Sequence, residues 1–223
     1  MYISNEFSRL EINLNGCLEN YRYFRSRLEA STKLLVLVKA NAYGHGAVQF
    51  ASLMEEAGAD YLAVAYPIEG IELRQAGIKS PVMVLTAGTD SFEQIVNYGL
   101  EPGIPNMYSL RVLCDVLQKR GINDFPIHIK IDTGMHRLGF MSDELPELMD
   151  FVKECRNVKI KSVYSHLAAA DDPDCDDFTL GQIRLFRENA DKLTDRKSVP
   201  RRKVYLDQSN GIPVQDIWLD YLD

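Results

Sequence analysis

Val38-Lys39-Ala40-Asn41-Ala42-Tyr43-Gly44-His45-Gly46 follows the apolar run Leu34-Leu35-Val36-Leu37. An apolar run of this kind is typical of a buried strand, so Lys39 is expected where that strand ends. An ammonium group at the edge of an apolar core loses hydration unless a partner compensates it. A desolvated lysine amine can attack a carbonyl carbon. The segment therefore indicates either a lysine that carries chemistry or one that extends to solvent.

Six further strand-like runs follow along the chain, with amphipathic helical patterns between them. They are Tyr61–Ala65, Pro81–Leu85, Leu100–Ile104, Ile127–Ile131, Ile160–Ser165 and Lys203–Leu206. Short runs rich in β-branched residues, each followed by a helix, are typical of parallel βαβ units. Seven such units in about 190 residues favour an α/β fold, a (βα)8 barrel, over a shorter open sheet. The count is one strand short. Residues 218–223 are interpreted as the entry into an eighth strand, so the barrel is expected to be cut before or within that strand.

The two ends of the chain suggest its domain organisation. Residues 9–14 alternate polar and apolar side chains and predict a strand with no obvious partner in the chain. We therefore divide the chain into residues 1–14, a strand that would belong with a C-terminal β-domain, and residues 15–223, the barrel. Within the barrel, Asn106 predicts the start of a helix that runs to Arg120, and Ser142 with its two following acids predicts the start of another.

Composition limits the partners. The chain has 223 residues and a formal charge of −7, which disfavours nucleic acid and anionic membranes. Its apolar runs are far shorter than a membrane span, and its first residues show no secretory signal, so the cytoplasm is expected. Four scattered cysteines predict neither a disulfide framework nor a zinc site. The acidic run 171–177 is interpreted as a solvated turn and helix cap, and no metal site is predicted.

Polar residues gather where the predicted strands end. In a (βα)8 barrel these ends form one rim, where the active site lies. Lys39 ends the first strand, Lys130 and Arg137 lie at or after the end of the fifth, His166 ends the sixth and Ser209 follows the seventh. These groups predict a cationic pocket for a small anionic ligand with a reactive carbonyl.

Two of these segments resemble a known family. Residues 38–46 and the segment Lys-Ile-Asp-Thr-Gly-Met-His-Arg-Leu-Gly-Phe at 130–140 closely resemble the signatures of alanine racemases, which use pyridoxal 5′-phosphate (PLP). Residues 165–168, 63–65 and 69–74 support the resemblance, which runs from about residue 9 to the end of the chain.

The resemblance implies a role for each rim residue. Lys39 would form the Schiff base with PLP and act as a base on one face of the substrate Cα. Tyr43 and Ser209 would bind the cofactor phosphate, and His166 would lie against the pyridine ring. Arg137 would donate to the phenolic oxygen of the cofactor. Lys130, carbamylated in some members of the family, would hold that arginine.

The resemblance also implies an activity, the interconversion of L- and D-alanine for bacterial cell-wall (peptidoglycan) synthesis. A second base, a tyrosine from the C-terminal domain of a partner in a homodimer, would lie outside this chain, so the chain is expected to be inactive or weak by itself. Two alternatives stay open: a non-catalytic PLP-binding barrel of cofactor homeostasis, and a racemase for serine or a broader range of amino acids. A decarboxylase of the same barrel type is not supported, since no glycine-triplet loop follows the sixth or seventh strand.

Overall fold

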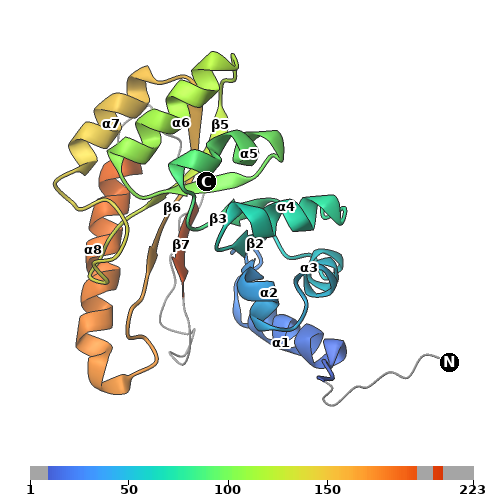
Figure 1. Cartoon of the computed structure of the whole chain (residues 1–223). Helices are drawn as coiled ribbons and strands as arrows, with labels where there is room; N and C mark the ends of the chain where they lie inside the picture. The colour runs from blue at the N-terminus through green and yellow to red at the C-terminus, as the bar shows by residue number, and fades with distance from the viewer. Residues whose placement is uncertain (1–9, 195–202, 208–223) are drawn as a thin grey trace.

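The computed structural model describes residues 10–194 and 203–207. Its centre is a seven-stranded sheet whose strands are all parallel and lie in sequence order (Figure 1). The strands are β1 (Leu35–Leu37), β2 (Tyr61–Val64), β3 (Val82–Val84), β4 (Glu101–Ile104), β5 (Phe125–Lys130), β6 (Val158–His166) and β7 (Lys203–Asp207). All seven predicted strands are confirmed, with ends that differ by a few residues.

One helix precedes the first strand, and the others connect successive strands. They are α1 (Leu14–Arg27), α2 (Lys39–Tyr43), α3 (Ala47–Glu56), α4 (Pro67–Gln75), α5 (Phe92–Asn97), α6 (Met107–Lys119), α7 (Leu145–Glu154) and α8 (Asp176–Thr194), with short 3₁₀ turns at η1 (Thr89–Ser91) and η2 (Pro173–Cys175). In the described part of the chain no helix is long and apolar enough to cross a membrane.

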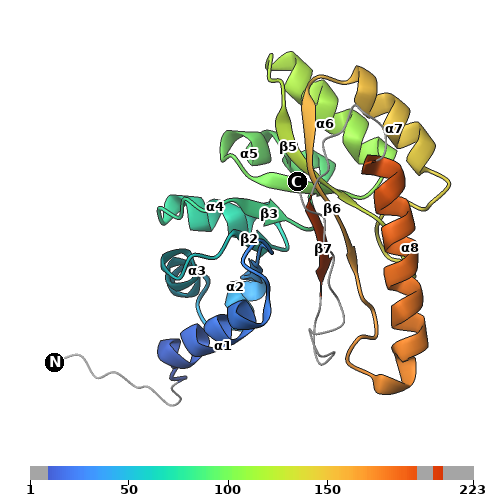
Figure 2. The ribbon, with the colours of Figure 1, turned by 180° about the vertical axis from the view of Figure 1, so that it is seen from behind.

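The sheet curls, and the helices cover its outer side, as seen from both directions in Figures 1 and 2. β1 and β7 stand at the two ends of the strand order. This is the α/β architecture of a (βα)8 barrel with seven of its strands described, as predicted. The expected entry into an eighth strand, residues 218–223, lies outside the described residues.

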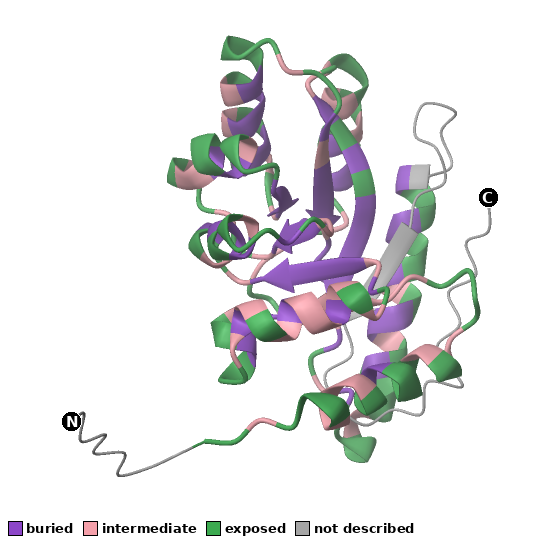
Figure 3. Ribbon diagram, turned by 90° about the vertical axis from the view of Figure 1, so that its right-hand side faces the viewer, coloured by how far each residue is buried: buried purple, intermediate pink, exposed green. Residues whose placement is uncertain are grey.

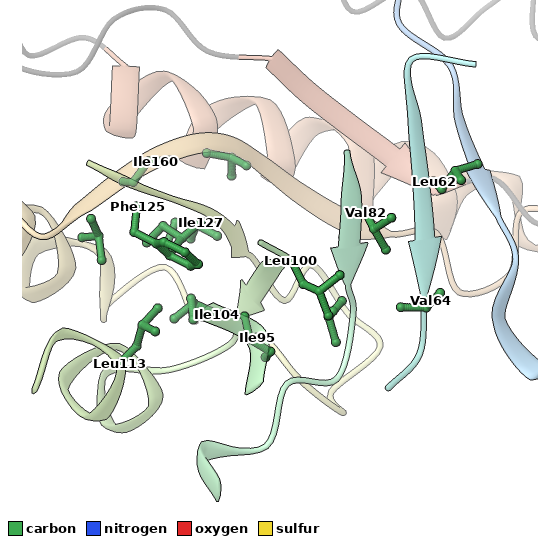
Figure 4. Packing of buried hydrophobic residues seen from close by; sticks show 14 of the residues in the cluster. Leu62, Val64, Val82, Ile95, Leu100, Ile104, Leu113, Phe125, Ile127 and Ile160 are labelled. Carbon is green, nitrogen blue, oxygen red and sulfur yellow. The ribbon is translucent and has the colours of Figure 1, made fainter. Parts of the chain in front are cut away.

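The two faces of the sheet carry different cores, because successive side chains of a strand point to opposite faces. Toward the helices, Leu62, Val82 and Ile127 belong to the main apolar core (Figure 4), and Figure 3 shows the buried residues concentrated along the strands. On the inner face, Ala63, Met83 and Tyr164 form a smaller cluster, packed against partly buried leucines of β1. The strands therefore read as nearly continuous apolar runs, as sheets buried on both faces do.

A buried polar layer lies on the inner face, nearer the start of the strands. His128 Nε2 lies 2.9 Å from Glu101 Oε2, and His128 Nδ1 lies 2.6 Å from Ser162 Oγ. The Tyr61 hydroxyl donates to the same Glu101 oxygen at 3.1 Å. Burial works against the charge of Glu101, but bonds from His128 and Tyr61 and the charge of Lys161 outweigh it and lower the Glu101 pKa. The layer satisfies its polar groups mutually and therefore stabilises the barrel interior.

Two helix starts differ from the predictions. Residues 10–13 lie in no strand, and Leu14 begins α1, because the Asn13 side chain caps the helix by accepting from Gly16 N at 3.1 Å. The assignment of residues 1–14 to a separate β-domain stays a prediction. The helix expected from Ser142 begins at Leu145, and Glu144 accepts from Met141 N at 2.7 Å in the preceding turn. The predicted Asn106 cap is confirmed, with Ser109 N donating at 2.9 Å.

Candidate active site at the strand ends

The inner-face alternation continues to the C-terminal rim of the sheet. Leu35 and Leu37 of β1 pack against the inner cluster, and Lys39 stands two residues beyond Leu37, just past the end of that strand. In the same way Tyr164 leads to His166 at the end of β6. Lys130 ends β5 opposite Tyr164, and its Nζ lies 5.5 Å from the centre of that ring. Lys39, Lys130 and His166 thus all lie at the C-terminal end of the parallel sheet, and each is half-buried.

The chain turns sharply after Lys39. Ala40, Asn41, Ala42 and Tyr43 have φ values of 51°, 55°, 50° and 54°, so α2 is a left-handed turn. For residues other than glycine this conformation costs roughly 1–2 kcal/mol each. The turn folds the exposed Tyr43 back, so that the Lys39 Nζ lies 5.8 Å from the centre of its ring. A strained backbone at this point therefore places an amine and a phenol next to each other.

Two side chains hold this turn in place. The Glu69 carboxylate accepts from Ala40 N at 2.6 Å through one oxygen, and from Ala65 N at 2.7 Å and Tyr66 N at 2.9 Å through the other. It therefore ties the end of β1 to the end of β2. Asn41 Oδ1 accepts from Ala47 N at 2.8 Å and fixes the start of α3 to the turn. These bonds offset part of the backbone strain.

The loop after β5 is organised around Asp132. Its Oδ1 accepts from Gly134 N at 2.8 Å and from His136 N at 3.1 Å, while Oδ2 lies 3.5 Å from His136 Nδ1. The loop returns to the sheet where Phe140 N donates to Lys130 O at 2.8 Å. Gly139 makes this return possible, because a Cβ there would lie 2.5 Å from Asp132 N and its φ is 132°.

A buried polar group joins this loop to the end of β6. The Gln182 side chain on α8 donates to Thr133 Oγ1 at 3.2 Å and to His166 O at 3.0 Å. Thr133 Oγ1 in turn lies 2.8 Å from Ser165 Oγ. Since Gln182 is 1% exposed, these bonds are shielded from water and fix the backbone around His166.

Two further site residues were predicted, Arg137 and Ser209. Arg137 is exposed in the β5 loop, and its guanidinium makes no hydrogen bond or ion pair within the described part of the chain. Two cations repel, so Lys130 can hold Arg137 only with an anion between them or after its amine is converted to a carbamate. Ser209 lies outside the described residues.

The acidic run behaves as a helix cap, in agreement with its interpretation. Asp172 Oδ1 accepts from Asp174 N at 3.0 Å ahead of α8. Across residues 10–194 and 203–207 there is no group of three or more side chains that could hold a metal ion.

Sequence reasoning did not assign Glu69 or Gln182 to the site. Glu69 lies 29 residues from Ala40 along the chain, and Gln182 lies 49 from Thr133. The one sequence signal for Glu69 is its position near the start of a helix that follows a strand, where a carboxylate can accept backbone N–H groups. The corresponding sequence signal for Gln182 is that it is a polar residue on the apolar, buried face of an amphipathic helix.

Comparison with known proteins identifies the fold's family. The family model described as alanine racemase, N-terminal domain, matches residues 12–221. An alanine racemase of Synechocystis sp. is 37% identical over 194 residues, which cover 86% of this chain and 52% of the relative. One of Nostoc sp. is 38% identical over 168 residues, covering 74% and 44%. The chain thus spans about half the length of these curated relatives.

Solved structures give the same result. An alanine racemase of Clostridium difficile superposes with a TM-score of 0.82 at 30% identity, covering 88% of this chain and 54% of that one. A Bartonella henselae alanine racemase with covalently bound pyridoxal phosphate has a TM-score of 0.75 at 26% identity, covering 87% and 55%. With its curled parallel sheet and its lysine at the end of β1, the chain belongs to the family of alanine racemase N-terminal domains.

Proposed function

We propose that this chain is the cofactor-binding part of a PLP-dependent alanine racemase, with Lys39 as the residue that binds PLP covalently. The position of Lys39 carries the proposal: it is half-buried at the C-terminal end of the sheet, directly before a left-handed turn held by Glu69, with Tyr43 beside it. Such a turn is costly and is found where the surrounding structure fixes a functional group. The family membership of the chain gives the same expectation.

The donor set fits an anionic aldehyde cofactor. Lys39 supplies an amine, and Tyr43 supplies a phenol that is exposed and can donate to a phosphate. Lys130 and His166 add nitrogen donors at the same rim. Arg137, exposed in the β5 loop, supplies N–H donors that can bond an oxygen anion of the cofactor. Ser209, two residues beyond β7, is proposed as a further phosphate ligand on the family resemblance.

The reaction requires the proton on the substrate Cα to leave one face and return to the other. PLP, when bound, supplies an electron sink for the charge left on Cα. Lys39 holds the cofactor at rest and moves the Cα proton on one face during turnover. Glu69 and Asn41 keep the turn that carries Lys39 in one conformation, so that its amine stays oriented. No residue of this chain is assigned as the base for the opposite face, which we place in another part of a homodimeric enzyme.

Exchange of the Cα proton tests this proposal. In D₂O with PLP, the chain should introduce deuterium at Cα of one alanine enantiomer faster than it inverts that enantiomer, because one base of two is present. General acid–base groups contribute about 10²–10⁴-fold each, so inversion should be slower by a factor in that range. Proton NMR with chiral analysis measures both rates. Equal exchange by Lys39→Ala would show that Lys39 is not the base. Binding of PLP without any exchange would support the non-catalytic barrel instead. Faster exchange with serine would indicate the broader racemase.

A further inference from the structure

Two thiols meet at the opposite end of the sheet from this site. Cys114 lies on α6 and is buried, and Cys155 is the C-cap residue of α7 and is half-buried. Cys155 stands three residues before β6 begins, which places it at the N-terminal edge of the strands. The Sγ atoms are 3.0 Å apart. Ordinary non-bonded contacts between carbon atoms are about 3.5–4.0 Å, so the two sulfur atoms are unusually close.

The surroundings fix this arrangement. Cys155 N donates to Phe151 O at 3.0 Å, which closes the last turn of α7. Asn157, two residues further on, donates through its side chain to Ile122 O at 2.8 Å and so holds the segment against the chain that follows α6. A disulfide has an S–S distance of about 2.05 Å, so the two sulfur atoms need to approach by about 1 Å.

We infer that Cys114 and Cys155 form an oxidation site, in which a small peroxide converts the two thiols into an intramolecular disulfide. The half-buried Cys155 is the sulfur that a solvent-borne oxidant reaches first. Burial, together with Cys155 and Asp115, raises the pKa of the Cys114 thiol, so Cys114 acts second.

The chemistry balances in two steps. The Cys155 sulfur attacks one oxygen of hydrogen peroxide, the O–O bond breaks, and a sulfenic acid and water result. The Cys114 sulfur then attacks Cys155 Sγ, the S–O bond breaks, and the hydroxyl group leaves with the Cys114 proton as water. Two thiols and one peroxide thus give one disulfide and two waters. Because the loop that is closed contains about 41 residues, the oxidised chain should be harder to unfold.

Peptide mapping tests the inference directly. A C17S/C175S variant, which keeps only this pair, is treated with one equivalent of hydrogen peroxide, alkylated and digested with trypsin without reduction. Cleavage at Arg111, Lys119, Lys153 and Arg156 releases residues 112–119 and 154–156. We expect these two peptides joined, with a mass lower by two hydrogen atoms and with neither cysteine alkylated.

Thermal unfolding gives a second readout. The oxidised variant should gain about 5–10 °C in Tm, and dithiothreitol should reverse the gain. A C17S/C114S/C175S control should show neither the joined peptides nor the gain. The inference would be overturned if Cys155 is converted to its sulfinic acid while Cys114 stays a thiol that the reagent alkylates. Disulfides formed only between separate chains would overturn it as well.

Discussion

Replacement of Glu69 by glutamine probes the link between β1 and β2. The glutamine keeps one oxygen acceptor, which can serve Ala65 and Tyr66 as before. Its amide group then faces Ala40 N, where the carboxylate accepted at 2.6 Å, and two donors oppose each other. Loss of a charged hydrogen bond costs about 1.5–3 kcal/mol. Because Ala40 is exposed and water replaces part of the bond, we expect a loss of about 1–2 kcal/mol in unfolding free energy.

Urea unfolding measures this loss, which corresponds to about 2–8 °C in Tm. Hydrogen exchange locates it, with faster exchange expected at the amides of residues 40–43. Lys39 should also react faster with an amine-modifying reagent, since its turn is released. Glu72→Gln is the matched control, because Glu72 is exposed on the same helix and carries the same charge. If Glu69→Gln and Glu72→Gln behave alike in all three assays, Glu69 does not hold the turn.

Three other substitutions, two of them with a matched control, test the site arginine, the buried ion pair and the close approach at Gly139. Arg137→Ala should change the unfolding free energy by less than about 0.5 kcal/mol but weaken PLP retention measured by dialysis. Arg184→Ala, at an exposed arginine of α8, should leave both the unfolding free energy and PLP retention unchanged. Because the Glu101 pKa is lowered, Glu101 contributes stability that is present above its ordinary pKa of 4.5 and is lost as pH falls through its folded-state pKa. The stability difference between wild type and Glu101→Gln should therefore shrink in acid. A difference that stays constant with pH would contradict the ion pair. Gly139→Ala should lower the unfolding free energy by more than about 2 kcal/mol, because the added Cβ meets the Asp132 backbone. Gly181→Ala, in open space on α8, should raise it by about 0.5–1 kcal/mol. Similar values for the two variants in urea unfolding would refute the close approach at Gly139.

The fold could be predicted from the sequence because each strand is a short apolar run next to a helix with recognisable ends. In parallel sheets buried on both faces, such runs stand out from the amphipathic helices between them. The rim followed from topology, since all strands end on one side. Lys39, Lys130 and His166 were therefore predicted to come together without any knowledge of distances.

The details at the rim could not be predicted, because they depend on contacts between distant residues. The left-handed turn at residues 40–43 contains no glycine, and Asn41 alone gives only a weak local preference for it. Its conformation depends on Glu69, whose partner lies on another βα unit. The alternating pattern at residues 9–14 predicted a strand, but the Asn13 cap and the packing of α1 against α3 favour a helix from Leu14.

The proposed function depends most directly on covalent attachment of PLP to Lys39. The chain is incubated with PLP, reduced with borohydride and digested, and the modified peptide is sequenced by mass spectrometry. We expect one equivalent of the reduced cofactor on Lys39 and loss of this label in Lys39→Ala. Labelling of Lys39→Ala at the same stoichiometry, or labelling spread over exposed lysines such as Lys79 and Lys119, would show that Lys39 is not the attachment site.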